Sequence, residues 1–235
     1  MTGQRFFHTF RGLYIPGIEV KREPMPVNPT WAASLEKQMQ ETQEALRRRD
    51  PAEVALWSGT TCETAAGETR LEAHFWGRPY LITWPDLAVR DKEGQPCPAH
   101  FQGLILQYLL LADGAPLEDN WVSLRNLPNG AFYEQAFQSY SGNLLVRSFR
   151  EDVEGFRAIA RSMGGEPLDT GDAAFRFWAL PRLPLAVVYW SGGGEFPDSA
   201  QVLFDKSASH YHHLEMLAHL GGMLCERIVQ AREKR

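Results

Sequence analysis

The chain has 235 residues, of which 44% are hydrophobic and 23% charged, and its formal net charge is −5. These values predict a soluble globular protein with a sizeable core, and they exclude a broad basic surface for nucleic acid or an anionic membrane. The three cysteines lie far apart with no CxxC, which excludes a disulfide framework or a cysteine-ligated cluster. With no apolar stretch that resembles a secretory signal or a membrane span, we expect a cytoplasmic protein.

Residues 1–30 combine several prolines with several large apolar side chains. Proline fixes φ and removes a backbone donor, so this segment predicts an irregular arm. Phe6, Phe7 and Tyr14 make the arm too apolar for a free tail. We therefore expect it to lie across the rest of the chain or a partner, including a second copy in a homo-oligomer. Residues 31–235 are then expected to form a single domain.

Helical periodicity accounts for about half of the remaining chain. Leu35, Met39 and Leu46 fall on one stripe, and Asp50-Pro51 reads as the N-cap and first residue of a second, short helix. A longer helical stretch has a predicted interruption near Phe149. The predicted helices are 31–49, 51–57, 99–114, 131–142, 143–165 and one that begins near Ser209.

The predicted strands come in two pairs, and each pair forms a hairpin. Within a pair the two strands are adjacent in sequence, so the strands do not alternate with helices. The predicted strands are 69–76 with 79–84, and 173–180 with 184–190. In the first hairpin His74 lies on the opposite face from Leu71 and Phe75. The nearly all-apolar run from Leu185 to Trp190 predicts a central strand buried on both faces. The order of elements indicates an α+β fold, with an antiparallel sheet built from two hairpins, helices packed on it and a C-terminal helix.

Three segments carry a resemblance to a known family: residues 104–137, 171–205 and 212–222. In order and spacing they resemble the uncharacterised-domain family catalogued as domain of unknown function 3786, across most of residues 50–225. The resemblance implies no particular activity. Some relatives carry an additional cysteine-rich iron–sulfur module, which implies redox or corrinoid metabolism, but this chain lacks the cysteines. Relatives also tend to carry an acidic pair before Phe-Pro, where this chain keeps only Glu195.

The stretch SASHYHHLEMLAHLGGMLCERI, from Ser207, contains four of the seven histidines. If it is one helix, His212, Glu215 and His219 fall within one narrow arc. Imidazole and carboxylate ligands together suit zinc or iron, so these three residues are candidate metal ligands. The alternative is the polar face of an ordinary amphipathic helix.

Two further carboxylates extend this candidate site. Glu195 belongs to the glycine-rich loop before the final helix, and Asp205 precedes the histidine stretch directly. Asp205 has an alternative role as the cap of the following turn. The candidate cofactor-binding set is therefore Glu195, Asp205, His212, Glu215 and His219.

Three classes of function remain open on the sequence alone. The first is a ligand-binding or accessory protein whose ligand is a small molecule, a metal ion or a metal-bearing cofactor such as a tetrapyrrole or corrinoid, for which one axial histidine suffices. The second is a metal-dependent enzyme with Glu195 or Glu215 as general base. The third is an assembly module that docks through its N-terminal arm. The sequence identifies no catalytic triad.

Overall fold

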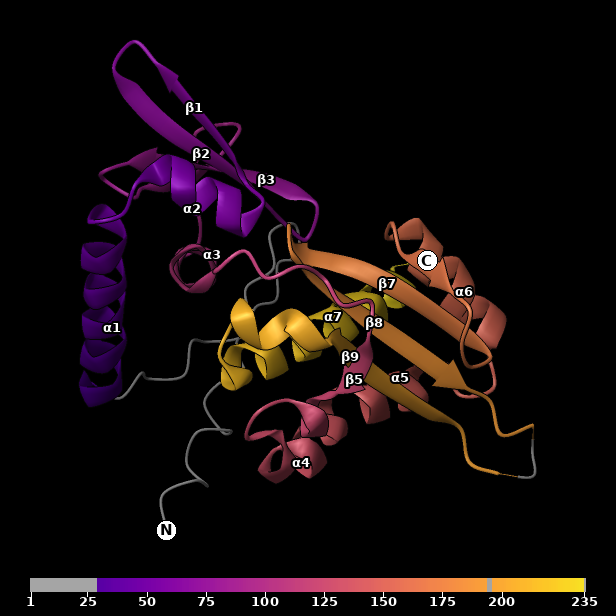
Figure 1. The fold of residues 1–235 in the computed structure, drawn as a ribbon. Helices are drawn as coiled ribbons and strands as arrows, with labels where there is room; N and C mark the ends of the chain where they lie inside the picture. Colours follow the sequence, from indigo (N-terminus) through magenta and orange to yellow (C-terminus); the bar gives the residue numbers. More distant parts are fainter. Residues whose placement is uncertain (1–28, 194–195, 235) are drawn as a thin grey trace. The chain divides into compact units, whose positions relative to one another are not determined.

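The computed structural model of the chain describes residues 29–193 and 196–234 (Figure 1). The chain divides into two units, residues 1–41 and 42–235, and the description below concerns the second. Within the described residues, no helix combines the length and the apolar composition that a bilayer crossing needs.

The predicted N-terminal arm, residues 1–30, falls almost entirely outside the described residues. Its irregular structure, its docking on a partner and its separation from a single domain 31–235 therefore stay predictions. Helix α1 (Pro29–Arg47) begins in the first unit and ends in the second, where Leu46 is fully buried.

Local sequence signals set the ends of some helices of the second unit, whereas the helix predicted over 99–114 ends at Leu111 and the one predicted over 131–142 covers only Glu134–Tyr140. Asp50 caps α2 by accepting a hydrogen bond from the Ala52 N–H, and Gly59 ends it in the left-handed conformation. The predicted interruption near Phe149 is confirmed, because Arg150 has a φ of 50° and Asp152 caps the next helix. These helices are α2 (Pro51–Ser58), α3 (Ala99–Leu111), α4 (Glu134–Tyr140), α5 (Gly142–Phe149), α6 (Val153–Ser162) and α7 (Leu214–Glu233).

The strands form two antiparallel sheets, which confirms the α+β class. The first sheet has the order β1 (Thr61–Ala65), β2 (Glu68–Phe75), β3 (Arg78–Trp84) and β4 (Val89–Asp91). The second has the order β5 (Trp121–Ser123), β9 (Ser199–Asp205), β8 (Leu183–Trp190), β7 (Ala173–Leu180) and β6 (Glu166–Leu168).

Each predicted hairpin is the centre of its own sheet, so the two hairpins do not share one sheet. They meet at one backbone hydrogen bond, in which the Trp76 N–H after β2 donates to the Ala179 carbonyl of β7 at 3.0 Å. The prediction for β8 is confirmed: it lies between β7 and β9, and every residue except Trp190 is buried.

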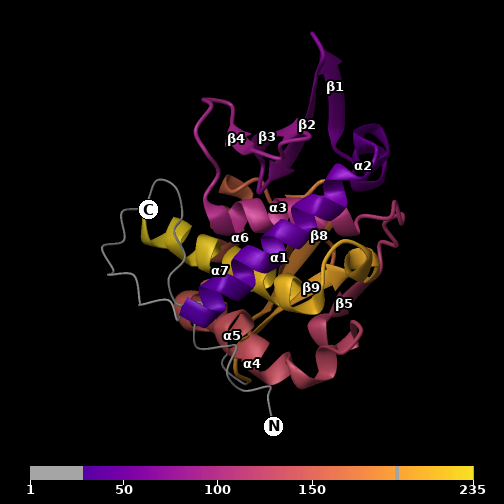
Figure 2. The same ribbon diagram turned by 90° about the vertical axis from the view of Figure 1, so that its left-hand side faces the viewer.

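The core lies mainly between the second sheet and the helices that pack on one of its faces. Phe156 of α6 stacks on Tyr189 of β8, with ring centroids 5.4 Å apart. Gly221 of α7 lies so close to Phe137 that a Cβ atom there would stand 2.7 Å from its ring. Figures 1 and 2 both place α3 between the first sheet and α7, so α3 links the two sheets through the core.

The start of the final helix differs from its prediction. Residues Lys206–His210 form a 3₁₀ turn, and α7 begins only at Leu214. The reason is local: Asp205 caps the turn, and the backbone N–H groups of Tyr211 and His212 both donate to the Ala208 carbonyl. His212 therefore precedes the helix and does not belong to a helical arc with Glu215 and His219.

Candidate functional site

His212 lies in the protein interior, with a relative exposure of 1%. Neither ring nitrogen has a hydrogen-bond partner within the described part of the chain, and the Tyr108 ring centroid is 6.3 Å away. Burial lowers the pKa of His212 to about 3, against an opposing effect of the Leu104 backbone, and the nearby His213 and His219 add to the lowering. The imidazole is therefore neutral at physiological pH and is enclosed by protein.

The other two candidate metal ligands lie on α7. Burial lowers the pKa of His219 to about 4, and the neighbouring His100 adds to this effect. Glu215 is exposed and accepts a long hydrogen bond of 3.4 Å from the Tyr133 hydroxyl. Across residues 29–193 and 196–234, no group of three or more His, Cys, Asp or Glu side chains is arranged to hold a metal ion. The metal site therefore stays a prediction, without a preformed set of three ligands.

Asp205 takes the capping role that was its alternative. Its Oδ1 accepts from the Ser207 N–H at 3.0 Å, the Ser207 hydroxyl at 2.6 Å and the Glu118 N–H at 3.1 Å. Its Oδ2 is buried and has no hydrogen-bond partner among the described residues. These bonds join the 3₁₀ turn to the segment that precedes β5.

Glu195 itself lies outside the described residues. Its neighbours Gly193 and Phe196 precede the Ser199 end of β9, whereas Asp205 forms the other end of this seven-residue strand. A strand of that length spans ~20 Å. The structure therefore places Gly193 and Phe196 at the other end of β9 from Asp205 and the start of α7. The site formed by the five candidate residues stays a prediction, because Glu195 is outside the described residues.

We call Asp205, His210, Tyr211 and His212 the enclosed histidine region. His210 Nδ1 lies 2.7 Å from Asp113 Oδ2, and the Tyr211 hydroxyl donates to the backbone carbonyl of the loop before β5. Partial burial raises the pKa of Asp113, but its hydrogen bonds outweigh this effect and leave the pKa below its ordinary value. The polar groups of this region mainly hold the turn and the loop together.

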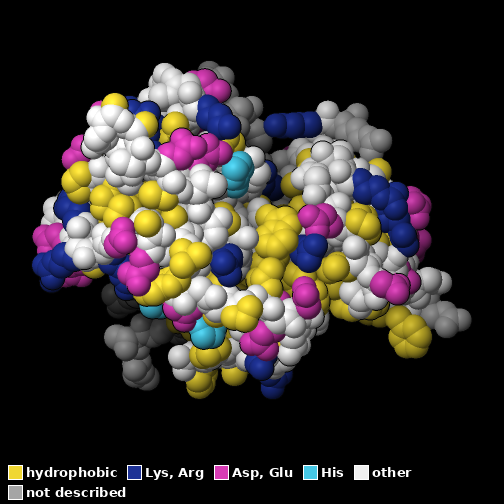
Figure 3. Space-filling model, turned by 45° about the horizontal axis from the view of Figure 1, so that its top comes forward, with side chains coloured by type: hydrophobic (Ala, Val, Ile, Leu, Met, Phe, Trp, Pro, Cys, Tyr) yellow, Lys and Arg dark blue, Asp and Glu magenta, His cyan; other side chains and the backbone are white. Residues whose placement is uncertain are grey.

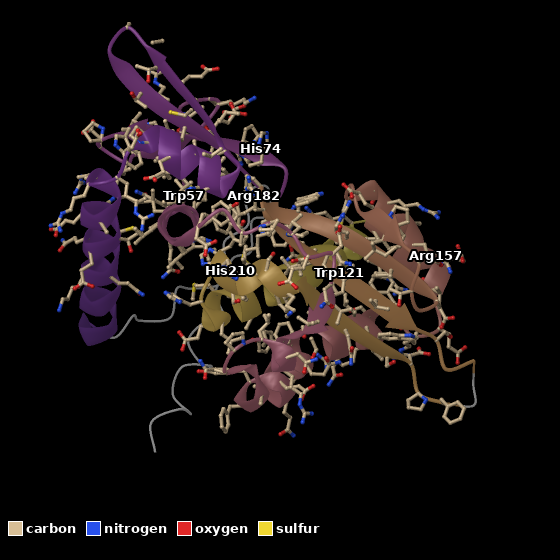
Figure 4. All side chains as sticks on the ribbon, viewed as in Figure 1. Trp57, His74, Trp121, Arg157, Arg182 and His210 are labelled. Atoms are coloured by element: carbon tan, nitrogen blue, oxygen red, sulfur yellow. The ribbon has the colours of Figure 1, made fainter. Side chains whose placement is uncertain are left out.

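A cleft of about 320 Å³ opens between the first sheet and the end of β7. We call it the intersheet cleft. Figure 3 looks towards this side of the molecule, where hydrophobic side chains gather between acidic and basic ones. Figure 4 shows His74 beside the junction of the two sheets, with Arg182 close by. The cleft is lined by Gly59, Thr61, Glu72, His74, Gly77, Trp178, Leu180 and Pro181.

Hydrogen bonds on both sides of the cleft fix its width. On one side the Trp76 N–H donates to the Ala179 carbonyl. On the other, the Tyr108 hydroxyl donates to the Ser58 carbonyl at 2.5 Å and accepts from the Arg182 N–H at 2.9 Å. Because Tyr108 is fully buried, these bonds are shielded from water. The end of α2 and the turn after β7 are thus held at a fixed separation.

Trp178 forms the aromatic wall of the cleft, and its neighbours hold it in place. Its Nε1 donates to Glu166 Oε1 at 3.0 Å, and the Arg176 guanidinium lies 5.1 Å from its ring centroid. Arg176 Nε donates to the other carboxylate oxygen of Glu166 at 2.8 Å. The hydrogen bonds from Arg176 and Trp178 lower the pKa of Glu166. The Trp178 indole is therefore fixed by a charged, hydrogen-bonded support.

Glu72 and His74 supply the polar side of the cleft. They lie two residues apart on β2, so both side chains project from the same face of the sheet. His74 Nε2 stands 3.6 Å from Glu72 Oε1, which is too long for a hydrogen bond, and Lys92 Nζ is 3.8 Å from the same oxygen. The two side chains are 56% and 30% exposed, in the order His74, Glu72, so both can bind a ligand.

A family model for a domain of unknown function, DUF3786, matches residues 50–227. The chain belongs to this family. The predicted resemblance is thereby confirmed, and the matched range includes every residue that lines the intersheet cleft. No curated protein and no solved structure matches the chain.

The sequence did not predict that these residues of the DUF3786 domain line a common cleft. One signal was present: the alternation in β2 placed Glu72 and His74 together, on the face opposite Leu71. The aromatic wall carried no such signal, because Trp178 belongs to a different sheet and meets β2 only through the tertiary fold.

A second, more open hollow of about 530 Å³ lies at the other end of β8 in the DUF3786 domain. Its lining adjoins residues 194–195, which are outside the described ranges, so only part of its wall is described. The hollow is lined by Trp190, Ser191, Gly192, Phe196, Pro197, Ser199 and Gln201.

Proposed function

We propose that this protein is a ligand-binding protein whose intersheet cleft takes up a small organic molecule. The observation that carries the proposal is the fixed pairing of an aromatic wall, Trp178, with an accessible polar pair, Glu72 and His74. Small-molecule sites are typically concave and mostly apolar, with a few well-placed polar groups that orient the ligand. The lining of the cleft has this composition, and its volume lies within the usual range.

The hydrogen bonds that hold the walls of the cleft in place also support this proposal. A site whose side chains are already held in place loses less conformational entropy when the ligand binds. Glu166 and Arg176 hold Trp178, and Tyr108 holds the turn at Arg182. The cleft is therefore preorganised for a ligand.

An enzyme is the second candidate, and Glu72 and His74 favour it. A carboxylate beside an imidazole can orient the ring and support general acid–base catalysis, and their 3.6 Å separation can shorten when a substrate binds. In this version His74 is the base and Glu72 orients it. Neither Glu195 nor Glu215, the general bases expected from the sequence, lines this cleft.

Binding of a metal ion or a tetrapyrrole stays a prediction from the sequence. The cleft is lined by a single histidine, and the enclosed His212 lines neither the cleft nor the hollow beside β8. The metal-dependent enzyme and the assembly module likewise stay predictions. We also propose a cytoplasmic location, which the three free cysteines support.

A cleft-filling variant tests the proposal. Thr61 is exposed at the edge of the cleft, so Thr61→Trp fills the cavity without entering the core. Ala65→Trp is the matched control, because it places the same side chain on the same face of β1 away from the cleft. A small-molecule library is screened by thermal shift against all three proteins. We expect compounds that stabilise the natural protein and Ala65→Trp but not Thr61→Trp. Compounds that stabilise Thr61→Trp equally, or none at all, would refute the proposal.

A further inference from the structure

We infer that the ligand of the intersheet cleft is an uncharged planar nitrogen heterocycle, which stacks on Trp178 and donates an edge N–H to Glu72. This inference rests on the proposed function and names the class of ligand. It follows from three features of the lining: one indole face, two polar side chains on one side, and a glycine, Gly77, whose backbone faces open space.

The first feature is that a single face of Trp178 is available. Arg176 lies over the ring at 5.1 Å, which leaves the other face of the indole for a ligand, and Trp178 lines the cleft. Glu166 holds both side chains, and the indole cannot rotate away without losing its 3.0 Å hydrogen bond. A rigid indole stacks on flat rings, and stacking between a base and an aromatic side chain contributes ~1–3 kcal/mol.

Arg176 also decides the charge of the stacked ring. The Arg176 cation over one indole face already engages the attraction of the ring quadrupole, which leaves less of it for a second cation on the other face, and Glu166 compensates the charge of Arg176 itself. The cleft moreover has one aromatic wall, whereas cages for quaternary ammonium groups surround the cation with several. The lining therefore favours an uncharged ring over an organic cation.

The polar side of the cleft fits the edge of such a ring. A carboxylate only accepts hydrogen bonds, whereas a neutral imidazole donates one and accepts one. Glu72 and His74 together therefore match a ring edge with an N–H beside a ring nitrogen or a carbonyl. Lys92, 3.8 Å from Glu72, balances its charge, so the pair does not require a charged ligand.

The rest of the lining excludes a ligand rich in hydroxyl groups. A sugar needs a partner for each buried hydroxyl, but Thr61, Glu72 and His74 are the lining residues with polar side chains, apart from the indole N–H that Glu166 already occupies. A Cβ atom at Gly77 would meet nothing within 4 Å, so open space faces its backbone. A flat ring with few polar atoms can therefore lie against the backbone there.

Indole N–H resonances give a direct test. The chain has seven tryptophans, so the others serve as internal controls in a spectrum of protein labelled with ¹⁵N-tryptophan. Adenine and cytosine are titrated as probes, and myo-inositol and choline serve as the non-planar and the cationic comparison. We expect adenine or cytosine to shift the Trp178 resonance, and the two comparison compounds to leave it in place.

Three variants separate stacking from edge recognition. Trp178→Leu removes the ring and Glu72→Gln removes the carboxylate. Each substitution is expected to weaken binding of the heterocycle at least tenfold, as measured by thermal shift. Trp178→Phe keeps an aromatic face and is expected to bind within a few-fold of the natural protein. Because Glu72 is partly exposed, Glu72→Gln keeps the test valid even if Trp178→Leu does not fold.

The outcomes distinguish this inference from the proposed function. If myo-inositol or choline shifts Trp178 and the heterocycles do not, the ligand class is wrong while the cleft remains a binding site. The same holds if the heterocycles do not bind but library compounds sensitive to Thr61→Trp do. If neither these four compounds nor any compound of the library perturbs Trp178, both the inference and the proposed function fail. Heterocycle binding that is unchanged in Trp178→Leu would overturn the stacking.

Discussion

The enclosed histidine region and the intersheet cleft use their polar side chains in opposite ways. In the first, Asp205 and His210 hydrogen-bond to neighbouring segments, and His212 is sealed from solvent. In the second, Glu72 and His74 stand 3.6 Å apart on an accessible face. A cluster of ligand-type residues in the sequence is thus no guide to a site, because burial, as at His212, or hydrogen bonding to a neighbouring segment, as at Asp205 and His210, can commit those residues to the fold.

This contrast predicts that the largest loss of stability comes from Asp205. In Asp205→Ala the 3₁₀ turn loses its cap and the Glu118 N–H loses its acceptor, which should cost about 2–4 kcal/mol of unfolding free energy. Urea denaturation measures it. Glu118→Ala, which removes only an exposed ion pair with Lys206, should change stability by less than about 1 kcal/mol. Equal effects of the two substitutions would contradict a structural role for Asp205.

Tyr108 connects the two regions, since its ring stacks on Tyr211 and its hydroxyl holds the cleft wall. Tyr108→Phe keeps the stacking but leaves the Ser58 carbonyl without this donor, at an expected cost of about 1–3 kcal/mol. The same substitution should weaken the binding of every ligand of the cleft. Tyr133→Phe, which removes a hydroxyl that donates a long 3.4 Å hydrogen bond to the exposed Glu215, serves as control. A Tyr108→Phe protein with normal stability and affinity would show that the wall does not depend on this bond.

The buried His212 should make stability depend on pH in a known direction. Its pKa in the folded protein is about 3, below the unfolded value of 6.5, so the unfolded chain takes up the proton first. The stabilisation is complete above pH 6.5 and is lost as the pH falls towards 3, by about 1.4 kcal/mol per pH unit once below 6.5.

Denaturation at pH values between 7 and 5 measures this slope, to which His219 also contributes because its pKa in the folded protein is lowered to about 4. His212→Gln should reduce the slope to the part that His219 contributes, whatever it does to stability at pH 7, whereas substitution of the exposed His213 should leave the slope unchanged. An identical slope in His212→Gln would show that His212 is not shielded from protons.

The smallest change in stability is expected in the cleft. His74→Ala removes an exposed side chain and should alter the unfolding free energy by less than about 0.5 kcal/mol. Ligand affinity, measured by calorimetry with a compound from the screen, should nevertheless fall at least tenfold. Arg70→Ala lies on the same strand and face but outside the lining, and should leave affinity unaltered. If both variants bind equally well, His74 takes no part in recognition.

The parts of the fold that could be predicted from the sequence depend on neighbouring residues. Asp50-Pro51 and Gly59 set the ends of α2, and the alternation of Leu71 and Phe75 set the inward face of β2. The apolar run of β8 likewise identified a strand covered on both sides. Each of these signals lies within a few residues, where backbone geometry and side-chain periodicity determine the outcome.

The features that escaped prediction either give little signal in the sequence, are overridden by a local turn, or depend on contacts between distant residues. The side chains of strand β1 are nearly all exposed, so its sequence shows little alternation between polar and apolar residues. Strand β9 follows a glycine-rich loop, which makes its first residue hard to predict. The helical arc of His212 failed because a capped turn replaced the first turns of the expected helix. The cleft escaped because its two walls come from segments that the chain brings together only when both sheets dock.

That docking has a thermodynamic consequence. The lining joins residues near Thr61 to residues near Trp178, so neither half of the domain contains a binding site by itself. A ligand of the cleft binds the native chain and has no comparable site on the unfolded one, so it raises the melting temperature by mass action. Proteolytic protection of the hairpin β2–β3 should then increase with ligand concentration, which would make susceptibility to cleavage a measure of occupancy.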